Sequence, residues 1–136
     1  MAQNIKLEIV TPEKIVIDEE VQIIMAPGVL GEFGVLSGHT PFLTSLKVGT
    51  ISYKDLNGAK NYIFVNEGFA EALPDKVTVL AQSSESKDSI DIDRAKKAKE
   101  RAEKRLDSSN TEDIDYERAK AALYRAIQRI NIVENI

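Results

Sequence analysis

The chain of 136 residues contains no cysteine and only one histidine. The lack of cysteine excludes disulfide bonds, a thiolate nucleophile and every cysteine-ligated metal site, and one histidine cannot form a multi-histidine site. Apolar runs are too short to cross a bilayer, and the first residues lack the apolar core of a signal peptide. We therefore expect neither metal-centred chemistry nor a membrane span.

Positive and negative side chains nearly balance: 18 are basic and 22 are acidic, which gives a net charge of −4. This balance gives no general attraction to nucleic acid or to an anionic membrane. The hydrophobic share of 43% is enough for a buried core. The composition predicts a folded protein that binds its partners through local features.

Glycine and proline occur only in the first part of the chain, and the last of them is Pro74. Residues 1–86 carry 6 basic and 11 acidic side chains, a net charge of −5, whereas residues 87–136 carry 12 and 11, a net charge of +1. Between them, the polar segment 83–89 offers no apolar residue to bury. We predict a domain boundary here, with one domain over 1–86 and a second over 87–136.

The first domain has the pattern of short strands. Ile5, Leu7 and Ile9 alternate with charged residues, as in a strand with one solvent-exposed face. Further segments rich in β-branched and aromatic residues are separated by turn residues such as Asn57-Gly58 and Pro74-Asp75. These segments are 15–17, 21–26, 48–53, 62–65, 69–73 and 77–81. We predict an all-β antiparallel sandwich or barrel of roughly eight to ten strands.

The second domain has helical periodicity, with two apolar rows spaced three and four residues apart. The rows are Ile92, Ala95, Ala98, Ala102 and Leu106, and Tyr116, Ala119, Leu123, Ala126, Ile130 and Val133. The short polar segment 107–112 between them predicts an antiparallel two-helix hairpin. Because the first row is mostly alanine, whose burial yields little free energy, we expect a closely packed but weakly held hairpin that can move.

Antiparallel pairing would bring the start of the first helix, with Asp91 and Arg94, beside the part of the second that carries Arg125 and Arg129. The last two are four residues apart and repel each other unless an anion lies between them. Guanidinium groups bind phosphate oxygens, and a carboxylate can accept a hydrogen bond from an amine, so the set suits a nucleotide. A solvated charged face with salt bridges explains the same pattern, and the pattern alone favours that interpretation.

The glycine-dense segment 28–41 contains Gly31 and Gly34, but it lacks the lysine of a phosphate-binding loop, and no helical pattern follows it. Tight turns between strands account better for its glycines. His39 has no cysteine partner and no spacing typical of a Ser-His-Asp triad, so we interpret it as a turn residue. No catalytic site is predicted.

Four motifs follow in order along nearly the whole chain: Val10-Thr11-Pro12, Gly31-Glu32-x-Gly34-Val-Leu-x-Gly38-His39-x-Pro41, the turn and strand that begin at Pro74-Asp75, and Ile90-Asp91-x-x-Arg94-Ala95. Together they resemble the motifs of the epsilon subunits of bacterial-type ATP synthases. Ser37 stands where many relatives have proline, and Phe33 where leucine or isoleucine is usual. Both departures leave the glycines of the loop in place.

The resemblance implies a non-catalytic rotor subunit of a proton- or sodium-translocating ATP synthase, which needs no cofactor and lies at the cytoplasmic face of the bacterial membrane. Its sandwich would bind the γ subunit and lie on the ring of c subunits, with Glu32, Gly38 and His39 at the ring. Its helices would either fold against the sandwich or extend into the catalytic head of α and β subunits and inhibit ATP hydrolysis. The inhibitory basic face would comprise Arg118, Lys120, Arg125 and Arg129.

Some bacterial members of this family bind ATP in the folded state through the Ile-Asp-x-x-Arg-Ala motif and two later arginines. The resemblance therefore implies a regulatory ATP site made of Ile90, Asp91, Arg94, Ala95, Arg125 and Arg129, with Glu85 as a further member. The residues that the hairpin argument brought together are among these. This agreement shifts the preferred interpretation from a charged face to an ATP site.

Two other classes of function stay open from the residues alone. A free-standing protein-binding sandwich would use the hairpin to form oligomers, and an enzyme ranks third. Copurification distinguishes them, because a rotary-synthase subunit should leave cell membranes together with γ and the catalytic α and β chains.

Overall fold

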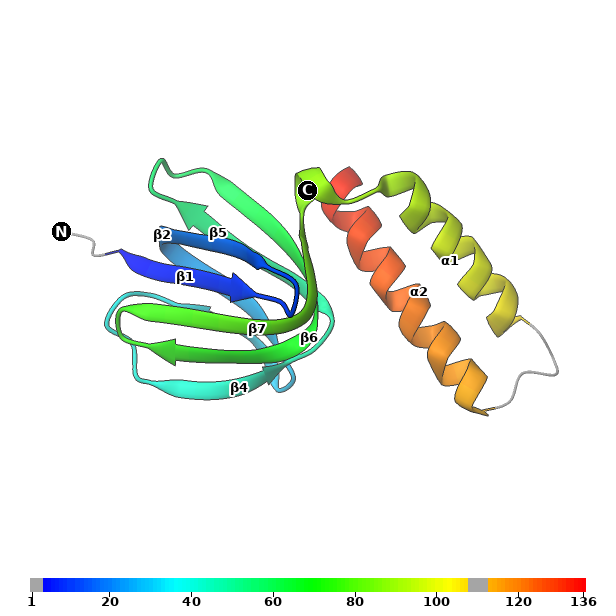
Figure 1. The fold of residues 1–136 in the computed structure, drawn as a ribbon, viewed down its shortest axis with the longest axis horizontal. Coiled ribbons are helices and arrows are strands. Elements are labelled where there is room, and N and C mark those ends of the chain that lie inside the picture. The colour runs from blue at the N-terminus through cyan, green and yellow to red at the C-terminus, as the bar shows by residue number, and fades with distance from the viewer. Residues whose placement is uncertain (1–3, 108–112) are drawn as a thin grey trace. The chain divides into compact units, whose positions relative to one another are not determined.

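The computed structural model describes residues 4–107 and 113–136 and contains two compact units, Met1–Lys87 and Asp88–Ile136 (Figure 1). The division falls one residue after the boundary predicted from charge. The first unit is built of strands and the second of helices. Across the ranges that the model describes, no helix is both long enough and apolar enough to cross a membrane.

The first unit is a β-sandwich, which confirms the predicted fold class. Its described strands are β1 (Ile5–Val10), β2 (Ile15–Gly28), β3 (Gly31–Val35), β4 (Phe42–Leu46), β5 (Gly49–Asp55), β6 (Lys60–Leu73) and β7 (Lys76–Ser86). The described residues form seven strands, whereas roughly eight to ten were predicted. The reason is that β2 and β6 are each 14 residues long and run through positions where two shorter strands were predicted.

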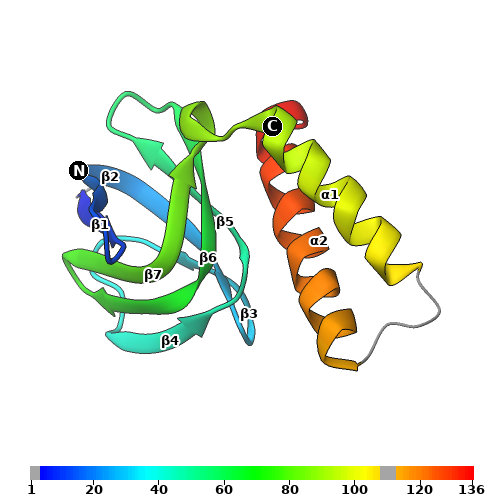
Figure 2. The ribbon, with the colours of Figure 1, turned by 45° about the vertical axis from the view of Figure 1, so that its right-hand side comes forward.

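Strand order is β1-β7-β6-β4-β2-β3, and β5 pairs with β2 and β6 while β1 also pairs with β2 (Figure 2). Every pair is antiparallel except β1 with β7, which is parallel. The predicted alternation in β1 is confirmed, since Ile5, Leu7 and Ile9 are fully buried in the core between the layers. The lysine and glutamate between them point outward and take part in cross-strand ion pairs.

A sharp change of neighbour occurs in the middle of β6. Its first half pairs with β5 as far as Val65, and its second half pairs with β4 from Gly68 onward. Two residues at this corner have positive φ angles, Glu67 at 50° and Gly68 at 155°. Glycine is required at the second position because a Cβ there would overlap the carbonyl oxygen of Leu80 on β7.

Strand β3 lies within the segment 28–41, whose glycines were interpreted as tight turns between strands, and β4 begins just after it; neither strand was predicted. The division between the two units falls within the polar segment 83–89, as expected for the boundary, but the first four residues of that segment belong to β7. Ser84 can lie in the sheet because its hydroxyl donates to the carbonyl oxygen of Phe64 at 2.8 Å, which satisfies a buried polar group. Only a short 3-10 turn, Lys87–Ser89, follows the strand.

The predicted turn at Asn57-Gly58 is confirmed, and Asp55 organises it. The Asp55 carboxylate accepts the backbone N–H groups of Asn57 and Ala59, at 2.9 and 3.0 Å, and the side-chain amide of Asn61 at 3.1 Å. These hydrogen bonds, that of Asn61 first, stabilise the charged form and lower the pKa of Asp55. The hairpin between β5 and β6 therefore has its own local support.

The second unit contains the two predicted helices, α1 (Ile92–Leu106) and α2 (Asp113–Glu134). They pack together, with the first turn of α1 beside the last turn of α2 in both ribbon views (Figures 1 and 2). Lys96 near the start of α1 bridges to Glu134 at the end of α2, at 3.1 Å. Residues 108–112 of the predicted connection lie outside the described residues.

The alanine seam of the hairpin is present. Ala95 and Ala102 of α1 and Ala119 and Ala126 of α2 are buried. In the second row, however, Tyr116 is exposed, while Ile132, which the prediction left out, is fully buried. The prediction that this row is buried is therefore correct for Ala119 and Ala126 and wrong for Tyr116.

Candidate functional site

The outer face of the sandwich carries a line of apolar side chains that crosses four strands, β2, β1, β7 and β6. The pairing sets Ile15 beside Val10, Val10 beside Leu80, and Leu80 beside Phe69, with Ser45 at the end. Directly paired residues lie on the same face of a sheet, so the side chains form a continuous strip. We call Val10, Ile15, Phe69 and Leu80 the apolar row.

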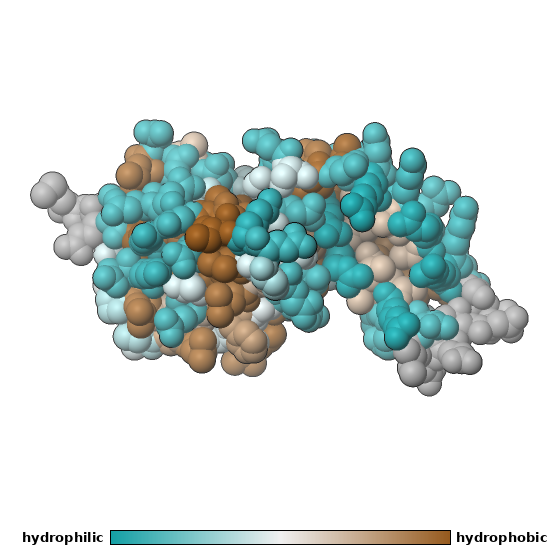
Figure 3. Space-filling model, viewed as in Figure 1, coloured by the Kyte–Doolittle hydropathy of each residue, from teal (hydrophilic) through white to brown (hydrophobic). Residues whose placement is uncertain are grey.

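The apolar row is open to solvent: Ile15 is 60% exposed and Phe69 and Leu80 are each 55% exposed. Leu43, paired with Glu71 in the adjacent row, is more exposed still. In Figure 3, apolar surface is gathered in one area of the sandwich, with hydrophilic side chains around it. Contiguous apolar surface of this kind is typical of a protein–protein contact.

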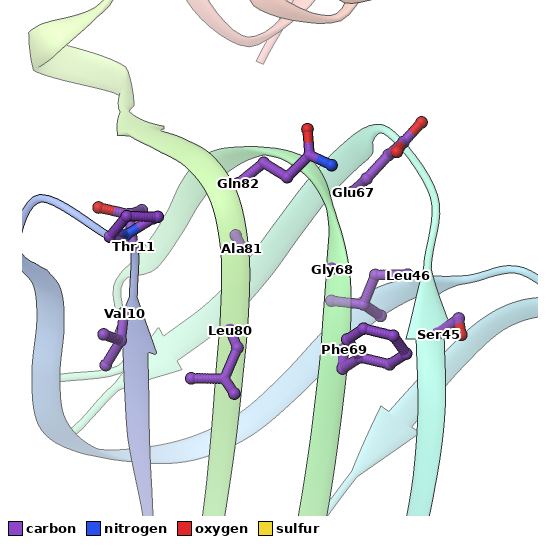
Figure 4. Close-up of a pocket in the computed structure, with 11 residues that line it drawn as sticks. Val10, Thr11, Ser45, Leu46, Glu67, Gly68, Phe69, Leu80, Ala81 and Gln82 are labelled. Carbon is purple, nitrogen blue, oxygen red and sulfur yellow. The ribbon is translucent and has the colours of Figure 1, made fainter.

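A hollow of about 640 Å³ lies over the same strands (Figure 4). The ends of β1 and β4 and the middle parts of β6 and β7 form it, and three members of the apolar row line it together with Glu67 and Gln82. The corner of β6 lies in this lining, because Glu67 and Gly68 are part of it. The hollow and the apolar row thus form a single candidate docking site.

The predicted loop residues lie on a different part of the sandwich. Glu32 is an exposed residue of the edge strand β3. Gly38 has a φ of +85°, which glycine adopts readily, and its N–H donates to the carbonyl oxygen of Pro74 at 2.7 Å. This bond ties the loop to the turn between β6 and β7.

His39 has the contacts of a structural turn residue. Its Nδ1 is 2.7 Å from the carbonyl oxygen of Thr40, so Nδ1 carries the proton, since a carbonyl only accepts. Its ring lies edge-on to Phe42, with centroids 5.6 Å apart, and Phe42 lies edge-on to Phe33 at 5.1 Å. The imidazole therefore fixes the shape of the loop, in agreement with its interpretation as a turn residue.

At the start of α1, the carboxylate of Asp91 caps the helix by accepting the N–H of Arg94 at 3.0 Å. The side chain of Arg94 is exposed, whereas Ile90 is buried and Ala95 lies in the seam. Asp91 thus has a structural role that the sequence pattern did not reveal. Glu85 belongs to the other unit, on β7 opposite Phe64.

The arginines of α2 occupy one side of that helix. At about 100° per residue, Arg118, Arg125 and Arg129 fall within about 40° of each other, whereas Lys120 is about 200° from Arg118. Arg125 and Arg129 are half-buried, and Arg118 and Lys120 are exposed. The helix therefore gathers three of the four predicted basic residues and sets Lys120 on the opposite side.

The pairing of the helices sets the last turns of α2 at the same end of the hairpin as Asp91 and Arg94. Arg129 precedes Glu134 by five residues, or about 7.5 Å, and Arg125 by nine, or about 13.5 Å, along the axis. A ligand that touches Asp91 and both arginines must therefore be elongated. Among the described residues, no group of three histidine or carboxylate side chains is arranged to hold a metal ion.

The exposed apolar row of the sandwich is typical of a surface that contacts other proteins. The chain belongs to the ATP synthase delta/epsilon family: the model of the family's beta-sandwich domain matches residues 4–87, and that of its long alpha-helix domain matches residues 88–134. Members of this family are non-catalytic subunits of the ATP synthase complex.

Two curated relatives are named ATP synthase epsilon chain. That of Desulforapulum autotrophicum is 58% identical over 134 residues, 98% of each chain, and that of Desulfosudis oleivorans is 61% identical over 108 residues, 79% of this chain and 81% of the relative. Among solved structures, a chain of the mitochondrial ATP synthase of Euglena gracilis, with OSCP, F1 and c-ring, has a TM-score of 0.81 at 23% identity and covers 92% of this chain and 78% of its own. The last similarity supports the fold.

Proposed function

We propose that this chain is the central-stalk subunit that joins γ to the ring of c subunits in a proton- or sodium-translocating bacterial ATP synthase, at the cytoplasmic face of the membrane. We further propose that its hairpin inhibits ATP hydrolysis by the α and β head. The exposed apolar row is the observation that carries the docking role, since burying it against γ removes apolar surface from water. The edge strand β3, with Glu32, and the following loop, with Gly38 and His39, would face the ring.

Truncation of the apolar row should weaken binding to γ. Leu80 lies in the middle of the row, and we expect Leu80→Ala to weaken γ binding about tenfold or more, as for central apolar contacts in other interfaces. Binding of purified γ by biolayer interferometry measures this. Leu56→Ala is the matched control, because Leu56 is exposed to nearly the same degree, 51% against 55%, but lies at the β5–β6 turn. If the two variants bind γ with equal affinity, γ does not bind to this face.

The hairpin supports the second part of the proposal. Asp91 and Arg94 lie at the start of α1, Arg129 lies near the end of α2 and Arg125 near its middle. The arginines carry donors suited to phosphate oxygens. ATP bound to both helices stabilises only the closed pair, by RT ln(1 + [L]/Kd), or about 1.4 kcal/mol for each tenfold excess over Kd. Because the buried seam consists mostly of alanine and contributes little free energy itself, the binding of ATP would decide whether the hairpin is closed.

Calorimetry on the isolated chain tests the ATP site. We expect ATP to bind, and Arg125→Ala to weaken binding at least about tenfold, because a charge-assisted contact contributes roughly 1.5 to 3 kcal/mol. Asp91→Ser should also weaken it, and serine keeps the helix cap that alanine would lose. Arg101→Ala, an exposed arginine of α1, is the control. Absence of binding heat at millimolar ATP would leave only a charged face.

A further inference from the structure

Two glutamates flank Phe69, the aromatic residue at one end of the apolar row. Glu67 and Glu71 stand two residues before and after Phe69 on β6, and all three side chains are exposed. Glu67 also lines the hollow, so one carboxylate borders each side of the docking site.

Neighbouring acidic residues on this face are neutralised, and these two are not. Asp18 and Glu8 lie in the same cross-strand row as Glu71, and they form ion pairs with Lys6 at 3.1 Å and with Lys76 at 3.7 Å. Within the part of the chain that the structure describes, neither Glu67 nor Glu71 takes part in an ion pair. The docking site therefore has an unbalanced negative border.

The chemistry of this border restricts what can cover the row. A purely apolar partner would desolvate both carboxylates without compensation, which is costly. A second copy of the sandwich would bring like charge, because residues 1–86 carry 11 acidic and 6 basic side chains. A partner with lysine or arginine on both sides of an apolar contact satisfies both requirements.

Resting on the docking function proposed above, we propose that the segment of γ that covers the apolar row has a basic–apolar–basic pattern. Its apolar residue contacts Phe69, and its two cations pair with Glu67 and Glu71, which thereby determine the specificity of docking. Border charges act mainly on the rate of association and on its salt dependence.

The experiment compares γ binding to the full-length chain at low and high salt. We expect the double variant Glu67→Gln/Glu71→Gln to bind about tenfold more weakly at low salt, mostly through slower association, and to lose most of the salt dependence. Glutamine keeps the size of the side chain. Glu20→Gln, an exposed glutamate on β2 away from the row, is the matched control and should change affinity less than twofold.

The outcomes separate this inference from the docking function itself. If Leu80→Ala weakens γ binding but the double glutamine variant matches the wild type in affinity and salt dependence, the basic pattern is wrong and docking stands. If neither set of variants changes γ binding, the docking face is wrong as well. Concentration-dependent dimerisation of the wild type that Phe69→Ala abolishes would overturn the inference in favour of a second copy.

Discussion

Replacing Gly68 with alanine should unfold the β-sandwich under conditions in which the wild type is stable. The new Cβ would overlap the carbonyl oxygen of Leu80 and lie 2.9 Å from the Cα of Ala81, and the φ of +155° is one that alanine avoids. Both β6 and β7 are hydrogen-bonded to neighbouring strands on both sides, so neither can move without breaking hydrogen bonds between them. We expect a loss of about 3 kcal/mol or more of unfolding free energy.

Such a loss corresponds to a fall in melting temperature of roughly 12 °C or more for a domain of this size, measurable by circular dichroism in the β region. Gly58→Ala is the matched control, because Gly58 has a φ of +83° but nothing within 4 Å of its added Cβ. Backbone strain alone should cost that variant about 1 to 2 kcal/mol. Equal losses in the two variants would show that the corner of β6 relaxes and that the overlap carries no cost.

Alternation and helical spacing are local signals, and where they are strong they predicted the fold. The pattern of Ile5, Leu7 and Ile9 identified β1, and the alanine spacing identified the hairpin seam. Strand β3 was missed because its segment is dense in glycine, which usually marks turns. Here Gly28 instead makes room for the ring of Phe33, since an added Cβ would be 3.0 Å from it.

The docking site could not have been predicted in the same way. Its members form two local pairs, Val10 with Ile15 and Phe69 with Leu80, each joined across neighbouring antiparallel strands. The two pairs are far apart in the sequence and meet through the parallel pairing of β1 with β7. Register depends on contacts between distant strands, for which a single sequence has no direct signal. An outward apolar residue such as Leu80 in an otherwise alternating strand is the one clue available.

Removing the hairpin should release ATP hydrolysis from inhibition in the assembled enzyme. A chain that ends at Lys87 keeps the whole sandwich, so assembly and coupling should persist, while the element proposed to enter the catalytic head is gone. A bias of about 1.4 kcal/mol toward the inhibited state leaves about one tenth of the enzyme active, so deletion would raise hydrolysis about tenfold. The measurement is the ATPase rate of membranes at low ATP, where the proposed site is mostly empty.

Charge substitutions identify which part of the hairpin acts on the head. Changing Arg118, Lys120, Arg125 and Arg129 together to alanine removes the four basic residues proposed to contact the head, but it also damages the proposed ATP site, and these effects oppose each other. At low ATP the loss of the head contact should dominate, because the stabilisation RT ln(1 + [L]/Kd) tends to zero. The pair Arg118→Ala/Lys120→Ala separates the two effects, since both side chains are exposed and neither belongs to the ATP set. Hydrolysis at low ATP that is equal with and without the hairpin would show that α1 and α2 do not inhibit this enzyme.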